Sequence, residues 1–168
     1  MIYAHENTGI AVLCDGQAYW LEDSEDSITL RPYISDPIAV LKMHSRSTIA
    51  RTETGRFIFV HKGSTSNSDI TADIETALSE GIDRVEDFSV DVLTVVAQTK
   101  RKVCIIDLDV LSQGTVLKNM GSIVFKIDSN IDLFCFKHGH GFARTSKGLY
   151  SVGNIASCSP SGNCYWFE

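Results

Sequence analysis

The sequence predicts an all-β repeat fold of about four antiparallel units, and three observations carry that prediction. A short pattern, in which an apolar residue and an alanine are followed by a polar turn and a second apolar run, recurs along the 168 residues. The spacing between its copies is similar each time. The segments alternate or form short apolar runs, without the periodicity of a helix. The alanines that anchor the copies are Ala11, Ala50, Ala97 and Ala143.

Each copy of the pattern has the features of a β-hairpin. Glycine stands five positions after the alanine in three copies, at Gly16, Gly55 and Gly148. At a tight turn glycine supplies the positive φ that a residue with a Cβ resists. Lys102 takes this position in the third copy. We therefore expect either a different turn type there or a lysine in the left-handed conformation.

The spacing of the copies indicates the architecture. Successive anchoring alanines are 39, 47 and 46 residues apart. A period of about forty to fifty residues with several strands per repeat is typical of the blades of a β-propeller. We expect one small propeller-like domain over residues 1–168, with units at about 1–36, 37–82, 83–120 and 121–168. The alternative is a β-sandwich or barrel made from the same hairpins.

Composition and charge describe an ordinary globular chain. With 43% apolar and 21% charged residues, the chain has enough apolar material for a core. It contains no apolar run long enough to span a membrane, and residues 1–6 lack the basic start and apolar core of a signal peptide. Five cysteines without CxxC spacing suit reduced thiols, so we expect a cytoplasmic or otherwise intracellular protein. The net charge of −6 makes nucleic acid an unfavourable partner.

The first unit is distinguished by an acidic loop. We expect strands near residues 9–13, 17–22 and 27–33, without an inner strand before them. Acidic side chains between the last two strands form either a solvated turn or a docking site for a basic partner. The candidate partner-binding residues are Glu22, Asp23, Glu25 and Asp26.

The second unit contains the one helical pattern of the chain. Residues 69–80 carry apolar side chains at helical spacing, with Ser68 as a candidate N-cap and Gly81 at the C-terminal stop. We expect a short amphipathic helix inserted after the hairpin, which either packs on the rim of the domain or binds a partner. The strands expected in this unit lie near residues 38–43, 47–52 and 56–62.

The third and fourth units complete the repeat. Residues 99–102 form the only basic run of the chain, which is either a solvated turn or a contact for an anion or an acidic partner. The expected strands of the third unit lie near residues 84–90, 93–98, 102–107 and 114–118. Those of the fourth unit lie near residues 122–127 and 131–137, before the last hairpin.

The C-terminal tail repeats the form of an earlier strand. Residues 162–168 resemble residues 16–22 in composition and order. We expect the tail to help complete the last unit and to pair with the first unit. That pairing would close a ring, either within one chain or between two copies in a homodimer, because an unpaired strand edge invites aggregation.

One constellation of metal-ligating side chains follows from the repeat. Three of its members stand six residues before their anchoring alanine, and the fourth stands five before. If these positions converge near an axis, imidazoles and a carboxylate would suit a divalent transition metal. The alternative is that each side chain bonds neighbouring backbone or lies on a solvated rim. The candidate metal ligands are His5, His44, Asp91 and His138.

A second cluster lies in the last unit. His138 and His140 stand at i and i+2, which places them on one face of a strand, where both can bind a metal. His138 could instead activate Cys135 as a nucleophile, although the apolar neighbours of Cys135 predict a buried and unreactive thiol. The chain has no phosphate-binding glycine loop, hydrolase elbow or HExxH motif, so we expect no cofactor.

Residues 142–154 carry a family resemblance. The run Phe-Ala-Arg-Thr-Ser-Lys-Gly-Leu-Tyr-Ser-Val-Gly-Asn resembles the repeat of RCC1-like (regulator of chromosome condensation) propellers, whose units often have a histidine where this chain has His140. Residues 49–60 are similar but lack the closing Trp-Gly. That family closes seven blades from a much longer chain, so its ring size and exchange-factor activity do not carry over. The resemblance implies a propeller-like scaffold and a bias towards protein binding.

The function we favour from the sequence is that of a non-enzymatic protein-binding module. It would act as an adaptor or inhibitor that docks a macromolecular partner through loops at one end of the units, because loops carry recognition. The first alternative is a module that binds a small ligand or metal in an axial pocket. The second alternative is an enzyme with an unfamiliar site.

Overall fold

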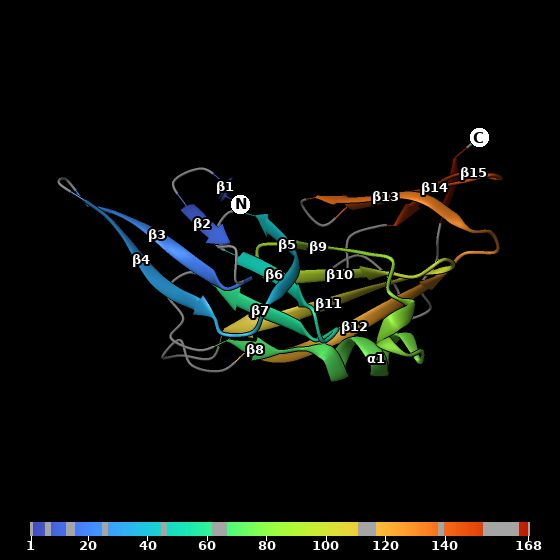
Figure 1. The fold of residues 1–168 in the computed structure, drawn as a ribbon. Coiled ribbons are helices and arrows are strands. Elements are labelled where there is room, and N and C mark those ends of the chain that lie inside the picture. The colour runs from blue at the N-terminus through green and yellow to red at the C-terminus, as the bar shows by residue number, and fades with distance from the viewer. Residues whose placement is uncertain are drawn as a thin grey trace.

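The computed structural model consists of four antiparallel sheets, each formed by four strands that follow one another along the chain (Figure 1). The expectation of an all-β repeat is thereby confirmed. The residues that the structure describes are 2–5, 8–12, 16–24, 27–44, 47–61, 67–110, 117–137, 140–152 and 165–167.

The four sheets are numbered in chain order. Sheet 1 contains β1 (Ile2–His5), β2 (Thr8–Val12), β3 (Ala18–Ser24) and β4 (Ser27–Ile34). Sheet 2 contains β5 (Ile38–His44), β6 (Ser47–Thr52), β7 (Phe57–His61) and β8 (Ser68–Asp69). Sheet 3 contains β9 (Asp87–Asp91), β10 (Thr94–Gln98), β11 (Lys102–Val110) and β12 (Leu117–Lys126). Sheet 4 contains β13 (Ile131–Lys137), β14 (His140–Thr145), β15 (Gly148–Val152) and β16 (Tyr165–Phe167).

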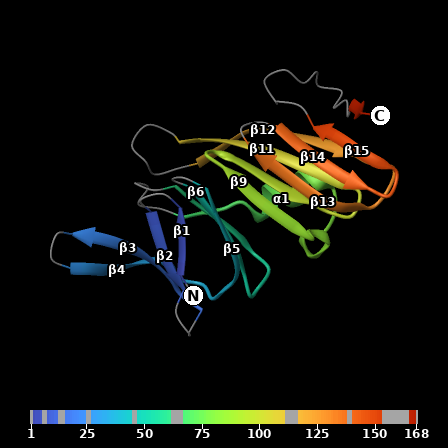
Figure 2. The same cartoon turned by 90° about the horizontal axis from the view of Figure 1, so that it is seen from above.

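The sheets stand side by side along an arc in chain order (Figure 2). The first strand of each sheet lies next to the first strand of the following sheet, so that β1 lies beside β5, β5 beside β9 and β9 beside β13. Sheets 1 and 4 occupy opposite ends of the arc (Figures 1 and 2). Consecutive sheets therefore pack face to face.

In sheets 2, 3 and 4 the anchoring alanine lies on the face that contacts the preceding sheet of the arc. We call the face that carries this alanine the leading face, and the opposite face the trailing face. Strand register pairs each alanine with one residue of the third strand on the same face. These pairs are Ala11–Tyr19, Ala50–Ile58, Ala97–Cys104 and Ala143–Tyr150.

Every interface along the arc uses the same two faces. Between sheets 1 and 2, Ala50 and Ile58 of the leading face pack with Ala18 of the trailing face. Between sheets 2 and 3, Ala97 packs with Phe57. Sheets 3 and 4 repeat the arrangement, because Ala143 and Tyr150 share a core with side chains from the trailing face of sheet 3. The small alanine lets neighbouring sheets approach, and the larger trailing residues fill the space between them.

The helical insertion is part of this core. Helix α1 (Thr71–Leu78) follows β8, and a single 3-10 turn, η1 (Ile82–Arg84), leads into sheet 3. Ile74 and Leu78 are buried with the apolar residues of sheets 2 and 3. The helix itself is therefore correctly predicted, and its apolar face packs inside the domain.

The two ends of α1 differ from the expected caps. Ser68 lies in β8, and the N-cap position belongs to Ile70, which makes no side-chain cap bond. The Asp69 carboxylate instead accepts a hydrogen bond from the Thr71 backbone N–H at 3.0 Å. The helix ends before Gly81, because Ser79 adopts the left-handed conformation at φ 52° and donates its N–H to the carbonyl of Glu75. A residue in that conformation cannot continue the helix.

Three strand assignments made from the sequence are wrong in whole or in part. Sheet 1 has its own inner strand, β1, so the first unit needs no strand from the C-terminus. Residues 122–127 do not begin the fourth unit, because β12 runs through them to Lys126 and pairs with β11. The register shifts between Asp107 and Leu108, and β11 and β12 remain paired on both sides of the shift. Two apolar runs that are separate in the sequence therefore form the single strand β12. The C-terminal strand β16 completes sheet 4 by pairing with β15, as expected, but within the described part of this chain it does not also pair with sheet 1.

The hairpin turns largely follow the glycine rule. Gly16, Gly55 and Gly148 have φ values of 81°, 84° and 140°, which favour glycine. Lys102 is not among the described residues with positive φ. The third turn is closed instead by the Thr99 N–H, which bonds the Lys102 carbonyl at 2.9 Å, and by the Thr99 hydroxyl, which accepts the Lys102 N–H at 3.2 Å. The first of the two alternatives, a different turn type, is the one observed.

Among the described residues, no helix has the length and apolar character needed to cross a membrane.

Candidate functional site

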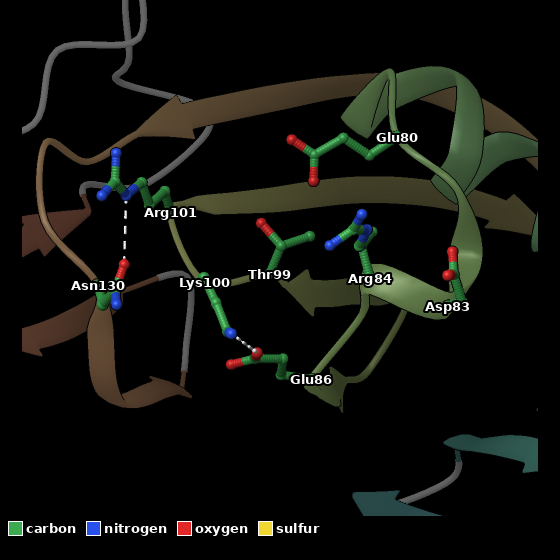
Figure 3. Close-up of a pocket in the computed structure, with 8 residues that line it drawn as sticks. All are labelled: Glu80, Asp83, Arg84, Glu86, Thr99, Lys100, Arg101 and Asn130. Atoms are coloured by element: carbon green, nitrogen blue, oxygen red, sulfur yellow. Dashed lines mark hydrogen bonds and ion pairs between the residues drawn. The ribbon is translucent and has the colours of Figure 1, made fainter.

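A charged groove lies at the end of sheet 3 where the helical insertion returns to the sheet (Figure 3). Its volume is about 680 Å³. We call it the mixed-charge groove, because carboxylates and cations line it in equal number. Its lining residues are Glu80, Asp83, Arg84, Glu86, Thr99, Lys100, Arg101 and Asn130.

Loops from separate parts of the chain build this groove. The segment after α1 supplies the first carboxylates and Arg84, and Glu86 stands just before β9. The β10–β11 turn supplies Lys100 and Arg101, and Asn130 precedes β13. The groove therefore combines the basic turn and the helical insertion, which the sequence identified as separate features.

The backbone of the basic turn is fixed by the sheets around it. The Lys100 carbonyl accepts the Ile131 N–H, and the Arg101 carbonyl accepts the Ile127 N–H, both at 2.8 Å. Both donors flank the connection between β12 and β13. The turn is therefore held by its main chain, so its fold does not depend on the contacts of the Lys100 and Arg101 side chains.

The side chains of the groove make weak contacts with one another. Lys100 Nζ lies 3.9 Å from Glu86 Oε1, and the Arg101 Nε donates to Asn130 Oδ1 at 3.2 Å (Figure 3). No side-chain hydrogen bond or ion pair of Arg84 occurs within the described stretches. Exposed ion pairs of this kind contribute about 0–1 kcal/mol. A ligand that carries charges of both signs can therefore replace these contacts at small cost.

Lys102 differs from the other cations of this region. Its Nζ donates to the Leu78 carbonyl and lies against Glu80 Oε1, each at 2.7 Å. It thus joins the C-terminal end of α1 to sheet 3, where a cation suits the helix dipole. Lys102 positions one wall of the groove and does not itself line it.

Two of the four candidate metal ligands meet in the structure. His44 ends β5 and Asp91 ends β9, and His44 Nδ1 lies 3.2 Å from Asp91 Oδ1. Both residues and His5 occupy the same position in their hairpins, because each pairs across the turn with the residue three positions later in the sequence. These three residues therefore hold equivalent backbone positions in their sheets. The side chain of His5 lies outside the part of the chain whose side chains are described.

In sheet 4 the position equivalent to that of His44 is described for Lys137. Lys137 pairs with His140 as His44 pairs with Ser47, so Lys137 holds that position in sheet 4. The sequence missed this because His138 is one residue closer to its alanine than the others are. His138 itself falls outside the described residues. Within the described stretches, no three His, Cys, Asp or Glu side chains gather as a metal site would require.

The two described cysteines have opposite environments. Cys135 is exposed on β13, which corrects the expectation that its apolar neighbours bury it. Alternation of faces along the strand explains this, since Phe134 and Phe136 point into the core between sheets 3 and 4. Cys104 is buried, and burial raises the pKa of its thiol to about 12. Cys104 is thus a core residue and not a nucleophile.

The acidic segment of sheet 1 belongs to a projecting hairpin. Glu22 and Asp23 lie in β3, which pairs with β4 as far as Ser24 and Ser27. Glu25 and Asp26, between these strands, fall outside the described residues. The hairpin extends beyond the other sheets at one end of the arc (Figure 1). The partner-binding role of these four residues stays a prediction.

Sequence reasoning missed much of the groove. The helix pattern pointed to residues 69–80, but the lining comes from residues just after it, namely Asp83, Arg84 and Glu86. Asn130 was also missed. The signal that could have found them is the density of charged residues between Glu80 and Asp87.

Comparison with known proteins shows likeness in fold alone. No family model matches the chain, and no curated protein sequence matches it. The computationally designed Ika4 protein is similar over 91% of this chain and 89% of its own, with 9% identity and a TM-score of 0.51. A chain in the structure of Kap60 bound to yeast RCC1 (Prp20) is similar over 92% of this chain and 42% of its own, with 14% identity and a TM-score of 0.52.

A third similar structure is PorZ, an essential surface component of the type-IX secretion system of Porphyromonas gingivalis. The similarity covers 91% of this chain and 19% of PorZ, with 11% identity and a TM-score of 0.54. This chain therefore spans less than half the length of the matched chains in the RCC1 complex and in PorZ. Such low identities say nothing about activity.

Proposed function

We propose that the protein is a non-enzymatic protein-binding module on a propeller-like, RCC1-like scaffold. It docks an extended segment of a partner protein in the mixed-charge groove. The observation that carries this proposal is the construction of the groove, in which three loops bordering sheet 3 present charged side chains on a fixed backbone. Recognition sites are commonly built this way, with variable loops on a rigid scaffold.

The chemistry of the lining favours a peptide over a small ligand. Small-molecule pockets are mostly apolar with a few polar groups, whereas these lining residues are all charged or polar. The groove carries Arg84, Lys100 and Arg101 on one hand and three carboxylates on the other. A segment with alternating acidic and basic side chains would complement both sets.

Removal of two cations from the groove tests the proposal. We would select binding peptides from a random displayed library with the intact protein, and measure their affinity by calorimetry. We expect Lys100→Ala combined with Arg101→Ala to weaken binding about tenfold, equivalent to about 1.4 kcal/mol. We also expect the remaining affinity to depend less on salt, because fewer charges are paired.

The matched control removes two cations elsewhere. Lys126 and Lys147 are exposed and do not line the groove. Lys126→Ala combined with Lys147→Ala changes the net charge equally and should leave peptide affinity unchanged. If both double variants lose affinity alike, the effect is one of total charge and the groove is not the site. If the Lys100/Arg101 variant binds as the parent does, the proposed function fails.

A further inference from the structure

The trailing face of sheet 4 repeats a surface that is buried elsewhere in the arc. Register places Phe142 and Leu149 where sheet 2 has Ile49 and Phe57, and where sheet 3 has another apolar pair. In sheets 2 and 3 these positions are sealed by the next sheet. The apolar pair of sheet 3 is Val96 and Val103.

The exposure of this surface at the end of the arc is large. Phe142 is 42% exposed and Leu149 is 43% exposed, whereas the four equivalent residues in sheets 2 and 3 are at most 1% exposed. The two side chains stand at diagonal positions on one sheet face, and exposed apolar side chains that gather on one face are a mark of an interaction surface. The face is therefore built like an inner interface but has no following sheet among the described residues.

A polar residue on the same face supports this reading. Arg144 stands in sheet 4 where Arg51 stands in sheet 2. Arg51 reaches across to the following unit and donates from Nη1 to the Val85 carbonyl at 3.3 Å. Arg144 therefore matches Arg51, which links two consecutive units, in residue type and in position.

The complementary surface lies at the other end of the same chain. In sheets 2, 3 and 4 the leading face covers the trailing face before it. Sheet 1 has Ala11 and Tyr19 on its leading face, the same two residue types as Ala143 and Tyr150, which cover sheet 3. Sheets 1 and 4 stand at opposite ends of the arc, so one arc does not bring these faces together (Figure 2).

We infer that a second copy of this chain docks head to tail on the first. The leading face of sheet 1 in each copy covers the trailing face of sheet 4 in the other, with Tyr19 against Phe142 and Leu149. Two such contacts close an eight-sheet ring. Heterologous contacts of this kind produce closed rings when their rotation completes a circle. The inference concerns the ends of the arc and does not depend on the mixed-charge groove.

Mass measurement by light scattering after gel filtration tests the inference on the intact chain. We expect the parent protein to have twice the chain mass of 18.5 kDa. Phe142→Glu combined with Leu149→Glu should have the mass of one chain, because charges placed in an apolar interface are costly to bury. Met120→Glu introduces one charge at an exposed apolar residue of another sheet and should leave the dimer intact.

Mixing two variants distinguishes a head-to-tail contact from a symmetric one. Tyr19→Glu damages the opposite face and should also produce single chains. Mixed with the Phe142/Leu149 variant, it should form a heterodimer, since one of the two contacts then joins two undamaged faces. Circular dichroism would verify that each variant keeps its strands, and Leu149→Ser replaces the double variant if that one unfolds.

Three results would overturn the inference. The first is a parent protein with the mass of one chain at every concentration tested. The second is a dimer that survives both face variants, and the third is an open series of larger oligomers, which would mean that the contacts do not close at two copies.

Discussion

Phe57→Ala should lower the free energy of unfolding by about 3–5 kcal/mol, the cost of removing a buried aromatic ring from a packed core. Phe57 is fully buried in the core that sheets 2 and 3 share with α1. Its ring meets Phe88 of sheet 3 edge to face, with centroids 5.0 Å apart. Its backbone N–H also donates to the Thr71 hydroxyl at 2.8 Å. The cavity would therefore weaken two sheets and the helix together.

Urea unfolding followed by circular dichroism measures this loss. The control is Val40→Ala, because Val40 also lies in sheet 2 but is 41% exposed. That substitution should change the free energy of unfolding by no more than about 0.5 kcal/mol. Equal small losses for both variants would mean that sheets 2 and 3 do not pack through Phe57.

Lys102→Met should cost about 1.5–3 kcal/mol, the range for hydrogen bonds to charged groups. Methionine keeps the apolar stem but removes the Nζ that bonds the Leu78 carbonyl and pairs with Glu80. Those two acceptors then lose their partner at the end of α1. We expect amide hydrogen exchange in residues 71–78 to accelerate, because the helix is no longer held to sheet 3.

The neighbouring lysine provides the matched control. Lys100 is 71% exposed in its side chain against 19% for Lys102, and its ion pair with Glu86 is long at 3.9 Å. Lys100→Met should therefore change stability by less than about 1 kcal/mol and leave helix exchange unaltered. If the two variants behave alike, Lys102 does not tether the helix.

The sequence predicts the repeat well because the repeat is a local property. Each hairpin is determined by an alanine, a turn and a β-branched or aromatic strand, and all of these are close in sequence. Gly16 and Gly55 take the positive φ that their turns require. The turn at Lys102 is local as well, since the Thr99 hydroxyl closes it without glycine.

Strand pairing over longer distances could not be predicted in the same way. β12 joins two apolar runs that an asparagine and a glycine interrupt in the sequence, and only its pairing with β11 reveals one strand. The sequence correctly places the C-terminal strand in the last unit, but its apolar composition does not specify whether it also joins an edge of sheet 1. The inner strand β1 was missed because it is short and lies at the end of the chain.

The candidate sites show the same division. Position in the repeat correctly related His5, His44 and Asp91, because register is carried along each hairpin. In sheet 4 the register gives the equivalent position to Lys137, one residue before His138 in the sequence. The mixed-charge groove combines segments from residues 80 to 130, and contacts between such distant segments leave no periodic signal.

Small-angle X-ray scattering on the parent protein and on the Phe142→Glu/Leu149→Glu variant tests the central claim, an arc of four sheets with complementary ends. The variant should scatter as an open arc with the mass of one 18.5 kDa chain. The parent should scatter as a closed ring of twice that mass. Contrary results would be a parent that scatters as a compact single chain, in which sheets 1 and 4 close on each other, or a variant whose scattering curve is the same as that of the parent.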